Sequence, residues 1–187
     1  MTLLLDALLV GVVLGLLGGG SLRRLGETHL RLEAILMGSL VLQLAMPGIA
    51  SAANMPRALA LYVWLMIMLV LVLVALLNHR EAGLLLVSLG IGLNALVIAI
   101  NGGMPVSEQA VTSLVGHTYV MSSDSADILH VPIRPSTVAA SLSDTIPLPG
   151  PKWHRGVVSV GDVFIASGVA AFVFISMTRG ASRSDGD

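Results

Sequence analysis

The sequence contains no cysteine, which excludes disulfide bonds, thiolate metal sites and thiol nucleophiles. Charge is also scarce, because charged residues make up 11% of the chain whereas soluble domains carry about 25%. The net charge of −1 gives no electrostatic attraction for nucleic acid, so no nucleic-acid partner is expected. What remains is apolar: 55% of the residues are hydrophobic and the mean hydropathy is +0.90. A soluble protein of 187 residues could not hide so much apolar surface, so the sequence predicts an integral membrane protein.

Five apolar runs are candidates for membrane spans, since a spanning helix needs about 20 residues. The first reaches this length only with its glycine extension, and the fourth is slightly short. The runs lie near residues 3–20, 34–53, 58–77, 83–100 and 157–177. We therefore predict an all-α fold, a polytopic membrane helix bundle of about five transmembrane helices formed by residues 1–178. Residues 179–187 are predicted to be a disordered tail.

The basic residues predict the orientation of these spans. The first run starts with an acid, Asp6, and is followed by Arg23 and Arg24, which is the reverse of a cleaved signal peptide. With five spans, one side of the membrane receives six arginines, and the other receives four basic residues, mostly in one long loop. Long loops count less in the positive-inside rule. We expect a multi-pass protein of the cell inner (cytoplasmic) membrane, with the N-terminus outside and the C-terminus in the cytoplasm.

The long loop, residues 101–156, is predicted to form an extracytoplasmic cap over the bundle. Ser107 is expected to cap a short helix over residues 108–115, and residues 136–142 a second one. The segment "IPLPGPKW" holds three prolines and should be extended. Trp153, just before the fifth run, suits a membrane interface.

Two amides seven residues apart, Asn94 and Asn101, mark the fourth run. Polar groups in the hydrocarbon are expensive, and two helical turns bring this pair to one face. Asn94 and Gln43, both in mid-span, either cross-link helices, with a bond between the two as one option, or belong to a site. Asn101 stands at the helix end before two glycines, so it is either part of a helix cap or part of a binding site.

Two carboxylates lie within the runs: Asp6 in the first and Asp162 in the fifth. Each is either a structural charge, in an ion pair or at a helix N-terminus, or part of a proton or cation site. The candidate cationic partners are Arg155, Lys152 and Arg134.

A third carboxylate, Asp144, stands just before the proline-rich stretch. It either organises a turn or, if the loop folds back, meets Asn101 and Asp162 in one outer pocket. The candidate binding residues are therefore Asn94, Asn101, Ser107, Asp144 and Asp162.

Other familiar sites are not indicated. The loop histidines His117, His130 and His154 lack the spacing of zinc ligands, so no metal is expected. No phosphate-binding loop or nucleophile turn occurs, and neither a cofactor nor a catalytic residue is assigned.

The first run carries Gly11, Gly15 and Gly19 at four-residue spacing. This pattern allows close helix packing, either within the chain or against a membrane-protein partner or second copy. The lipid bilayer is the one partner that the composition itself requires.

Three segments together resemble one family: "NGGMPVS" at 101–107, "DTIPLP" at 144–149 and "VVSVGDV" at 157–163. With the helix layout and "GGGSLRRL" at 18–25, nearly the whole chain is similar to the bacterial domain-of-unknown-function 5317 family. The resemblance implies about five spans, one long loop before the last, and a shared location for the motif residues. It implies no particular activity.

Three functions are compatible with these residues. The first is binding or transport of a small polar molecule, cation or lipid headgroup in an outward-facing polar pocket. The second is an accessory or assembly subunit of a larger membrane complex, in which the amides and glycines serve packing. The third is an enzyme acting on a lipid headgroup with Asp144 and Asp162 as acid–base pair or metal ligands.

Overall fold

The structure is a computed structural model that describes residues 2–121 and 127–179. It is mostly helical, with two small sheets near one end. The helices are α1 (Thr2–Leu17), α2 (Leu22–Gly26), α3 (Glu33–Ala52), α4 (Arg57–Leu77), α5 (Leu84–Asn101), α6 (Glu108–Val115) and α7 (Val160–Thr178). The predicted tail lies, apart from Arg179, outside the described residues.

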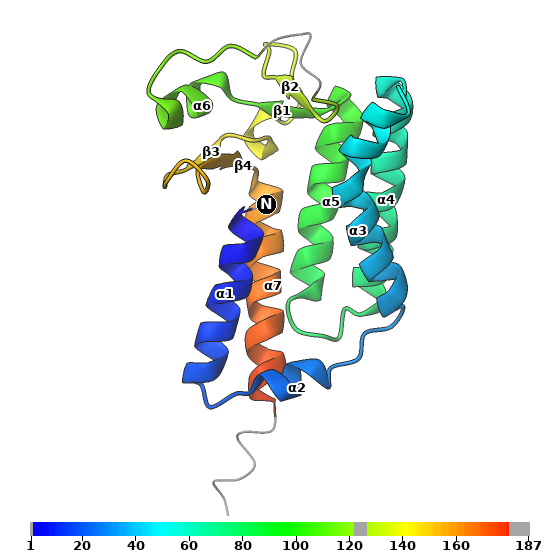
Figure 1. The fold of residues 1–187 in the computed structure, drawn as a ribbon, viewed down its shortest axis with the longest axis vertical. Helices are drawn as coiled ribbons and strands as arrows, with labels where there is room; N and C mark the ends of the chain where they lie inside the picture. Colours follow the sequence, from blue (N-terminus) through cyan, green and yellow to red (C-terminus); the bar gives the residue numbers. More distant parts are fainter. Residues whose placement is uncertain (1, 122–126, 180–187) are drawn as a thin grey trace, which may run out of the picture.

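By their contacts the long helices pack in the order α1, α7, α5, α4, α3, with α3 and α4 overlapping in the view of Figure 1. The last helix, α7, thus separates the first helix from α5, and α3 has its main contact with α4. The principal apolar cluster lies between α4 and α5. Its buried members are Leu61, Ile67, Met68, Leu71, Ile91, Val97, Ile98 and Met104.

Four helices within the described residues, α3, α4, α5 and α7, are long and apolar enough to cross a membrane. They coincide with predicted spans two to five to within three residues at each end. The first helix, α1, is apolar but has 16 residues. At 1.5 Å per residue this is about 24 Å, less than the roughly 30 Å hydrocarbon core. Four of the five predicted spans are therefore long enough to cross a membrane, and the count of five is not confirmed.

Glycines bring α7 close to α5 on one side. A Cβ on Gly90 would lie 2.4 Å from the carbonyl oxygen of Gly161, and one on Gly83 would lie 2.0 Å from that of Gly168. Real Cβ atoms do not approach so closely, so these backbones are in direct contact. Small residues at helix contacts allow this approach in membrane proteins.

The glycine stripe of α1 faces the other side of α7. A Cβ on Gly11 would lie 2.9 Å from the carbonyl oxygen of Ala170, and one on Gly15 would lie 2.7 Å from Sδ of Met177. Gly19 has a positive φ of 72° and open space around the position of a Cβ. Gly11 and Gly15 therefore serve packing within the chain, one of the two roles expected of them.

The long loop forms a cap of short elements at one end of the helices (Figure 1). Strand β1 (Met104–Val106) pairs in parallel with β2 (His130–Pro132), and β3 (Ile146–Leu148) pairs antiparallel with β4 (Gly156–Val158). Ser107 caps α6 as predicted, its Oγ accepting from the backbone N–H of Ala110 at 3.2 Å.

The predicted helix over residues 136–142 was wrong. Only a 3₁₀ turn, η1 (Ala140–Leu142), forms there, preceded by Ala139 in the left-handed conformation with φ 55°. The amide of Asn101 bonds both the N–H and the C=O of Val138, at 2.9 and 3.0 Å. These backbone groups are therefore not available for a helical ladder.

Different hydrogen bonds hold the chain together at each end of the helix bundle. At the cap end, Thr2 Oγ1 donates to the carbonyl of His154 at 3.1 Å, and the His154 ring contacts Asp6 at 2.7 Å. At the opposite end, Asn78 exchanges hydrogen bonds with the backbone of Arg31. The described chain therefore starts at the cap end and finishes, with α7, at the other.

Candidate functional site at the cap end of α5 and α7

A hydrogen-bonded polar group joins α5 to the start of α7. Ser159 is the N-cap of α7, and its Oγ accepts from the backbone N–H of Asp162 at 3.0 Å. The Asp162 carboxylate accepts in return from the backbone N–H of Ser159 at 3.0 Å, which completes a capping box. The sequence therefore places this carboxylate where a helix N-terminus stabilises negative charge.

Asn94 extends this group to α5. Its Nδ2 donates to Asp162 Oδ1 at 2.8 Å, while its Oδ1 accepts from the Ser159 hydroxyl at 2.9 Å. Gly161 makes this possible, because a Cβ there would lie 2.1 Å from Asn94 Oδ1. Asn94 and Ser159 are both buried, and both oxygens of Asp162 have a donor.

Asp162 is a helix N-terminal charge, one of the roles expected of it, whereas the cationic partners considered for the span carboxylates and the Asn94–Gln43 bond were wrong. No bond links Asn94 to Gln43 among the described residues, and Asp162 is paired with an amide and a backbone N–H rather than with a cation. Asp6 contacts His154 rather than any of the three basic residues considered. The Asn94 amide and the Asp162 carboxylate bond to each other, which lowers the free-energy cost of placing both in an apolar environment.

Asp144 lies in the cap close to this group. Its backbone N–H donates to the carbonyl of Pro105 at 2.9 Å, and its carbonyl accepts from the N–H of Ser107 at 2.9 Å. The residue is 7% exposed, and its Oδ1 is buried with no hydrogen-bond partner among the described residues. A buried polar atom without a partner is costly, so this oxygen requires an explanation.

His130 connects Asp144 to the surface. Its Nε2 lies 3.7 Å from Asp144 Oδ2, and its Nδ1 lies 2.7 Å from Asp127 Oδ2. The parallel pairing of β1 with β2 produces this arrangement, because it brings residue 130 beside residue 104. Side chains of His130 and Asp127 are each partly exposed, so the three groups run from the interior of the cap to its surface.

The pKa values of two carboxyls in the cap, Asp144 and Asp127, are shifted in opposite directions. Burial, followed by the negative charge of Asp162, raises the pKa of Asp144 from 3.8 to about 7, although His130 opposes the shift. Burial raises the pKa of Asp127, but the charge and hydrogen bonds of His130 lower it, and the net shift is downward. The pKa of Asp144 therefore lies near neutral pH, whereas that of Asp127 lies below its ordinary value.

Asn101 does not join the carboxylates. Its Nδ2 donates to the carbonyls of Val97 and Val138, and its Oδ1 accepts from the N–H of Val138. Gly102 follows in the left-handed conformation with φ 67° and closes the helix, as expected of a C-cap. The amide thus fastens the cap to α5.

A cavity of about 440 Å³ does open beside Asn101 in the cap. Arg134, Ser136 and Thr137 supply its other polar groups. Of the five predicted binding residues, only Asn101 lines it. The outer pocket predicted for Asn101, Ser107, Asp144 and Asp162 is therefore divided between two places. One is this cavity, and the other is the cluster of Asp144 with Asp162, Asn94 and the backbone of Ser107.

Sequence reasoning missed the roles of His130 and Ser159. The spacing Asp127-x-x-His130 was present, but histidines were weighed only as metal ligands. No group of three or more metal-ligating side chains suited to a metal ion occurs among residues 2–121 and 127–179. Ser159 three residues before Asp162 matches a capping box and was the available sequence indication.

The model of the family of unknown function DUF5317 matches residues 27–174. The chain belongs to this family. The match covers the five elements that build the cluster, α5, β1, β2, the segment before β3, and α7 up to residue 174. Searches of curated proteins and of solved structures return no significant match.

Proposed function

We propose that the protein is a multi-pass membrane protein that binds a small cation, in the simplest case a proton, at Asp144. The observation that carries the proposal is the buried Oδ1 of Asp144, which has no hydrogen-bond partner among the described residues. A proton or a bound cation would satisfy this oxygen, whereas an anion or a neutral acceptor would not.

The neighbours of Asp144 favour a positive ligand. Asp162 adds negative charge nearby, and it is held in place by Asn94 and Ser159. His130 and Asp127 lead from Asp144 to the surface of the cap, so a proton has a route of exchange with the solvent. A titrating carboxyl with a second carboxylate beside it is a common feature of functional sites.

The cap is assigned to the extracytoplasmic side of a cell inner membrane, with the N-terminus outside and the C-terminus in the cytoplasm. The support is the arginine distribution, because Arg23, Arg24, Arg31, Arg80 and Arg179 lie at the end opposite the cap. The ligand of Asp144 would then come from outside the cell.

Infrared titration tests the proposal directly. The protonated carboxyl band of the purified protein should disappear as the pH rises through about 7, and Asp144→Asn should lack that component. Sodium or potassium, added at constant ionic strength against choline, should lower the apparent pKa if either ion binds. An unchanged pKa restricts the ligand to a proton. A titration identical in the wild type and Asp144→Asn rejects the site.

The second candidate, a subunit of a larger assembly, is favoured by α3. Only Met46 and Ala50 of its 20 residues are buried, and a Cβ on Gly38 or Gly48 would meet nothing within 4 Å. Lipid or another protein must cover this helix. Native mass spectrometry distinguishes the cases, because an obligate subunit should appear as an oligomer or with a partner, and a Gly48→Leu variant should reduce that species.

A further inference from the structure

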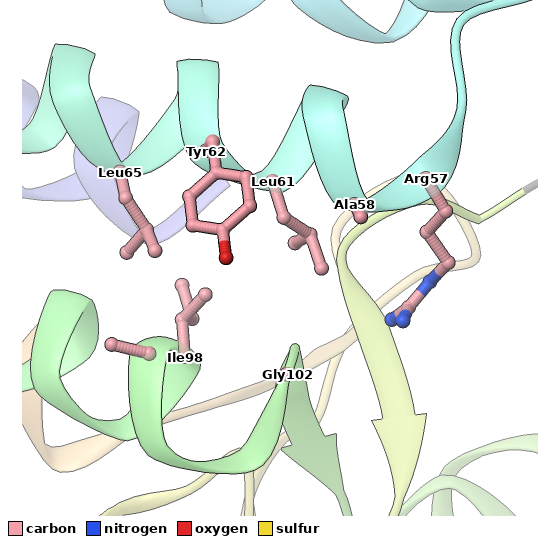
Figure 2. A pocket seen from close by; sticks show the side chains of 8 residues that line it. Arg57, Ala58, Leu61, Tyr62, Leu65, Ile98 and Gly102 are labelled. Atoms are coloured by element: carbon pink, nitrogen blue, oxygen red, sulfur yellow. The ribbon is translucent and has the colours of Figure 1, made fainter.

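A groove between α4 and α5 lies apart from the carboxyl cluster (Figure 2). Its volume is about 470 Å³, within the usual range for ligand sites. The lining residues are Arg57, Ala58, Leu61, Tyr62, Leu65, Ile98, Ala99 and Gly102. The α4 members recur at helical spacing and so form one stripe along that helix.

The groove is charged at one end only. Arg57, the first residue of α4, stands at the cap end, and Leu61 and Leu65 follow toward the middle of the helix (Figure 2). Tyr62, which is 67% exposed, directs its hydroxyl between the two helices. A charge at the end of a span followed by an apolar channel has the polarity of a phospholipid, whose phosphate lies at the interface and whose chains lie below.

The charge of Arg57 has no partner in the chain as described. No carboxylate within residues 2–121 and 127–179 lies within 4.0 Å of its guanidinium, and its side chain makes no hydrogen bond to those residues. The N-cap of α4, Pro56, supplies no capping side chain, so the positive end of the helix adds to this potential. The lining contains no acidic residue that could hold a choline or ethanolamine group.

We propose that this groove binds an anionic phospholipid, with the phosphate on Arg57 and an acyl chain along Leu61, Leu65 and Ile98. Guanidinium groups bind phosphate through strong charge-assisted hydrogen bonds. The exposed apolar surface beside Tyr62 leaves the groove open to the surrounding lipid. The site shares no residue with the Asp144 cluster, so either assignment can fail without the other.

Native mass spectrometry of the full-length protein in detergent, with added phosphatidylglycerol or phosphatidylcholine, tests the assignment. Phosphatidylglycerol should bind more tightly, and Arg57→Gln should weaken its binding about five- to tenfold, the effect of one interfacial arginine. Lys152→Gln is the control, because it removes one positive charge from an exposed position of the cap that does not line the groove. It should leave binding unchanged.

A second variant keeps the charge and fills the space. Ala99→Phe, at an exposed lining position, should lower phosphatidylglycerol binding while the protein keeps its thermal stability. Equal binding of the two lipids, equal losses in Arg57→Gln and Lys152→Gln, or full binding by Ala99→Phe would each overturn the proposal.

Discussion

The contact of α5 with α7 and the contact of α3 with α4 are built in opposite ways. Between α5 and α7, glycine backbones touch and Asn94, Ser159 and Asp162 bond across the contact. Along α3, the glycines face open space and two side chains are buried. The hydrogen-bonded polar side chains named here therefore lie where two helices are closest. The Asp144 site is built beside that rigid contact, and α3 remains available to lipid or a partner.

The largest expected effect is the difference in stability between substitutions at two glycines of α5, Gly90 and Gly92. Gly90→Leu should destabilise the protein by at least about 3 kcal/mol, because its side chain would collide with the Gly161 carbonyl and Ile165. Gly92→Leu is the control, since nothing lies within 4 Å of a Cβ there. Thermal unfolding in detergent measures both. Similar losses in the two variants would contradict the close contact of α5 with α7.

The two mid-span amides should differ next. Asn94→Leu should cost about 2 to 3 kcal/mol, because it leaves the buried Ser159 hydroxyl and the Asp162 carboxylate without their partner. Gln43→Leu should be nearly neutral, since the Gln43 side chain bonds no residue of the described chain. If Gln43→Leu proves the more harmful of the two, α3 depends on a polar contact outside this chain.

The pH dependence of stability should follow Asp144. The folded protein keeps the Asp144 proton up to about pH 7, whereas the unfolded chain loses it near pH 3.8. The folded state binds more protons between these values, so stability should fall as the pH rises through this window. The fall should be about 2 kcal/mol, below the roughly 4 that 1.36 kcal/mol per pKa unit allows.

Asp144→Asn should flatten this fall in stability and exceed the wild type in stability at pH 8. Glu27→Gln, which removes an exposed carboxylate far from the cap, should leave the pH dependence unchanged. A wild type whose melting temperature is constant from pH 4 to 8 would argue against a protonated Asp144.

The smallest effect concerns the attachment of the cap. Asn101→Ala should free the backbone of Val138 while costing at most about 1 kcal/mol overall, because the bonds are partly exposed. Hydrogen exchange should accelerate at residues 137–139 and remain unchanged in α7. Faster exchange at Asp162 as well would indicate that the two parts of the site are coupled.

The long helices could be predicted because hydropathy over about 20 residues reflects the bilayer itself. Ser107 and Gly102 were also predictable, since capping depends on residues within one turn. The position of α7 between α1 and α5 could not be predicted, although Gly161 and Gly168 are the residues that permit it. Which glycine faces which helix depends on the packing of distant segments.

The site shows the same division between local and distant information. Asp162 and Ser159 form a capping box within one helical turn, so their pairing could be predicted from the sequence. The approach of His130 to Asp144 depends on strands β1 and β2, whose paired residues are separated by 26 positions. No sequence motif near residue 130 predicts a parallel partner at residue 104, because parallel strands are not joined by a short turn.

The central claim, that burial and the neighbouring charge of Asp162 together favour a proton on Asp144, is tested most directly by one comparison. The pKa of Asp144 is measured by infrared titration in the wild type and in Asp162→Asn. We expect a value near 7 in the wild type and a lower value in Asp162→Asn, because the variant removes the neighbouring negative charge. An Asp144 pKa that is unchanged or higher in Asp162→Asn would contradict it.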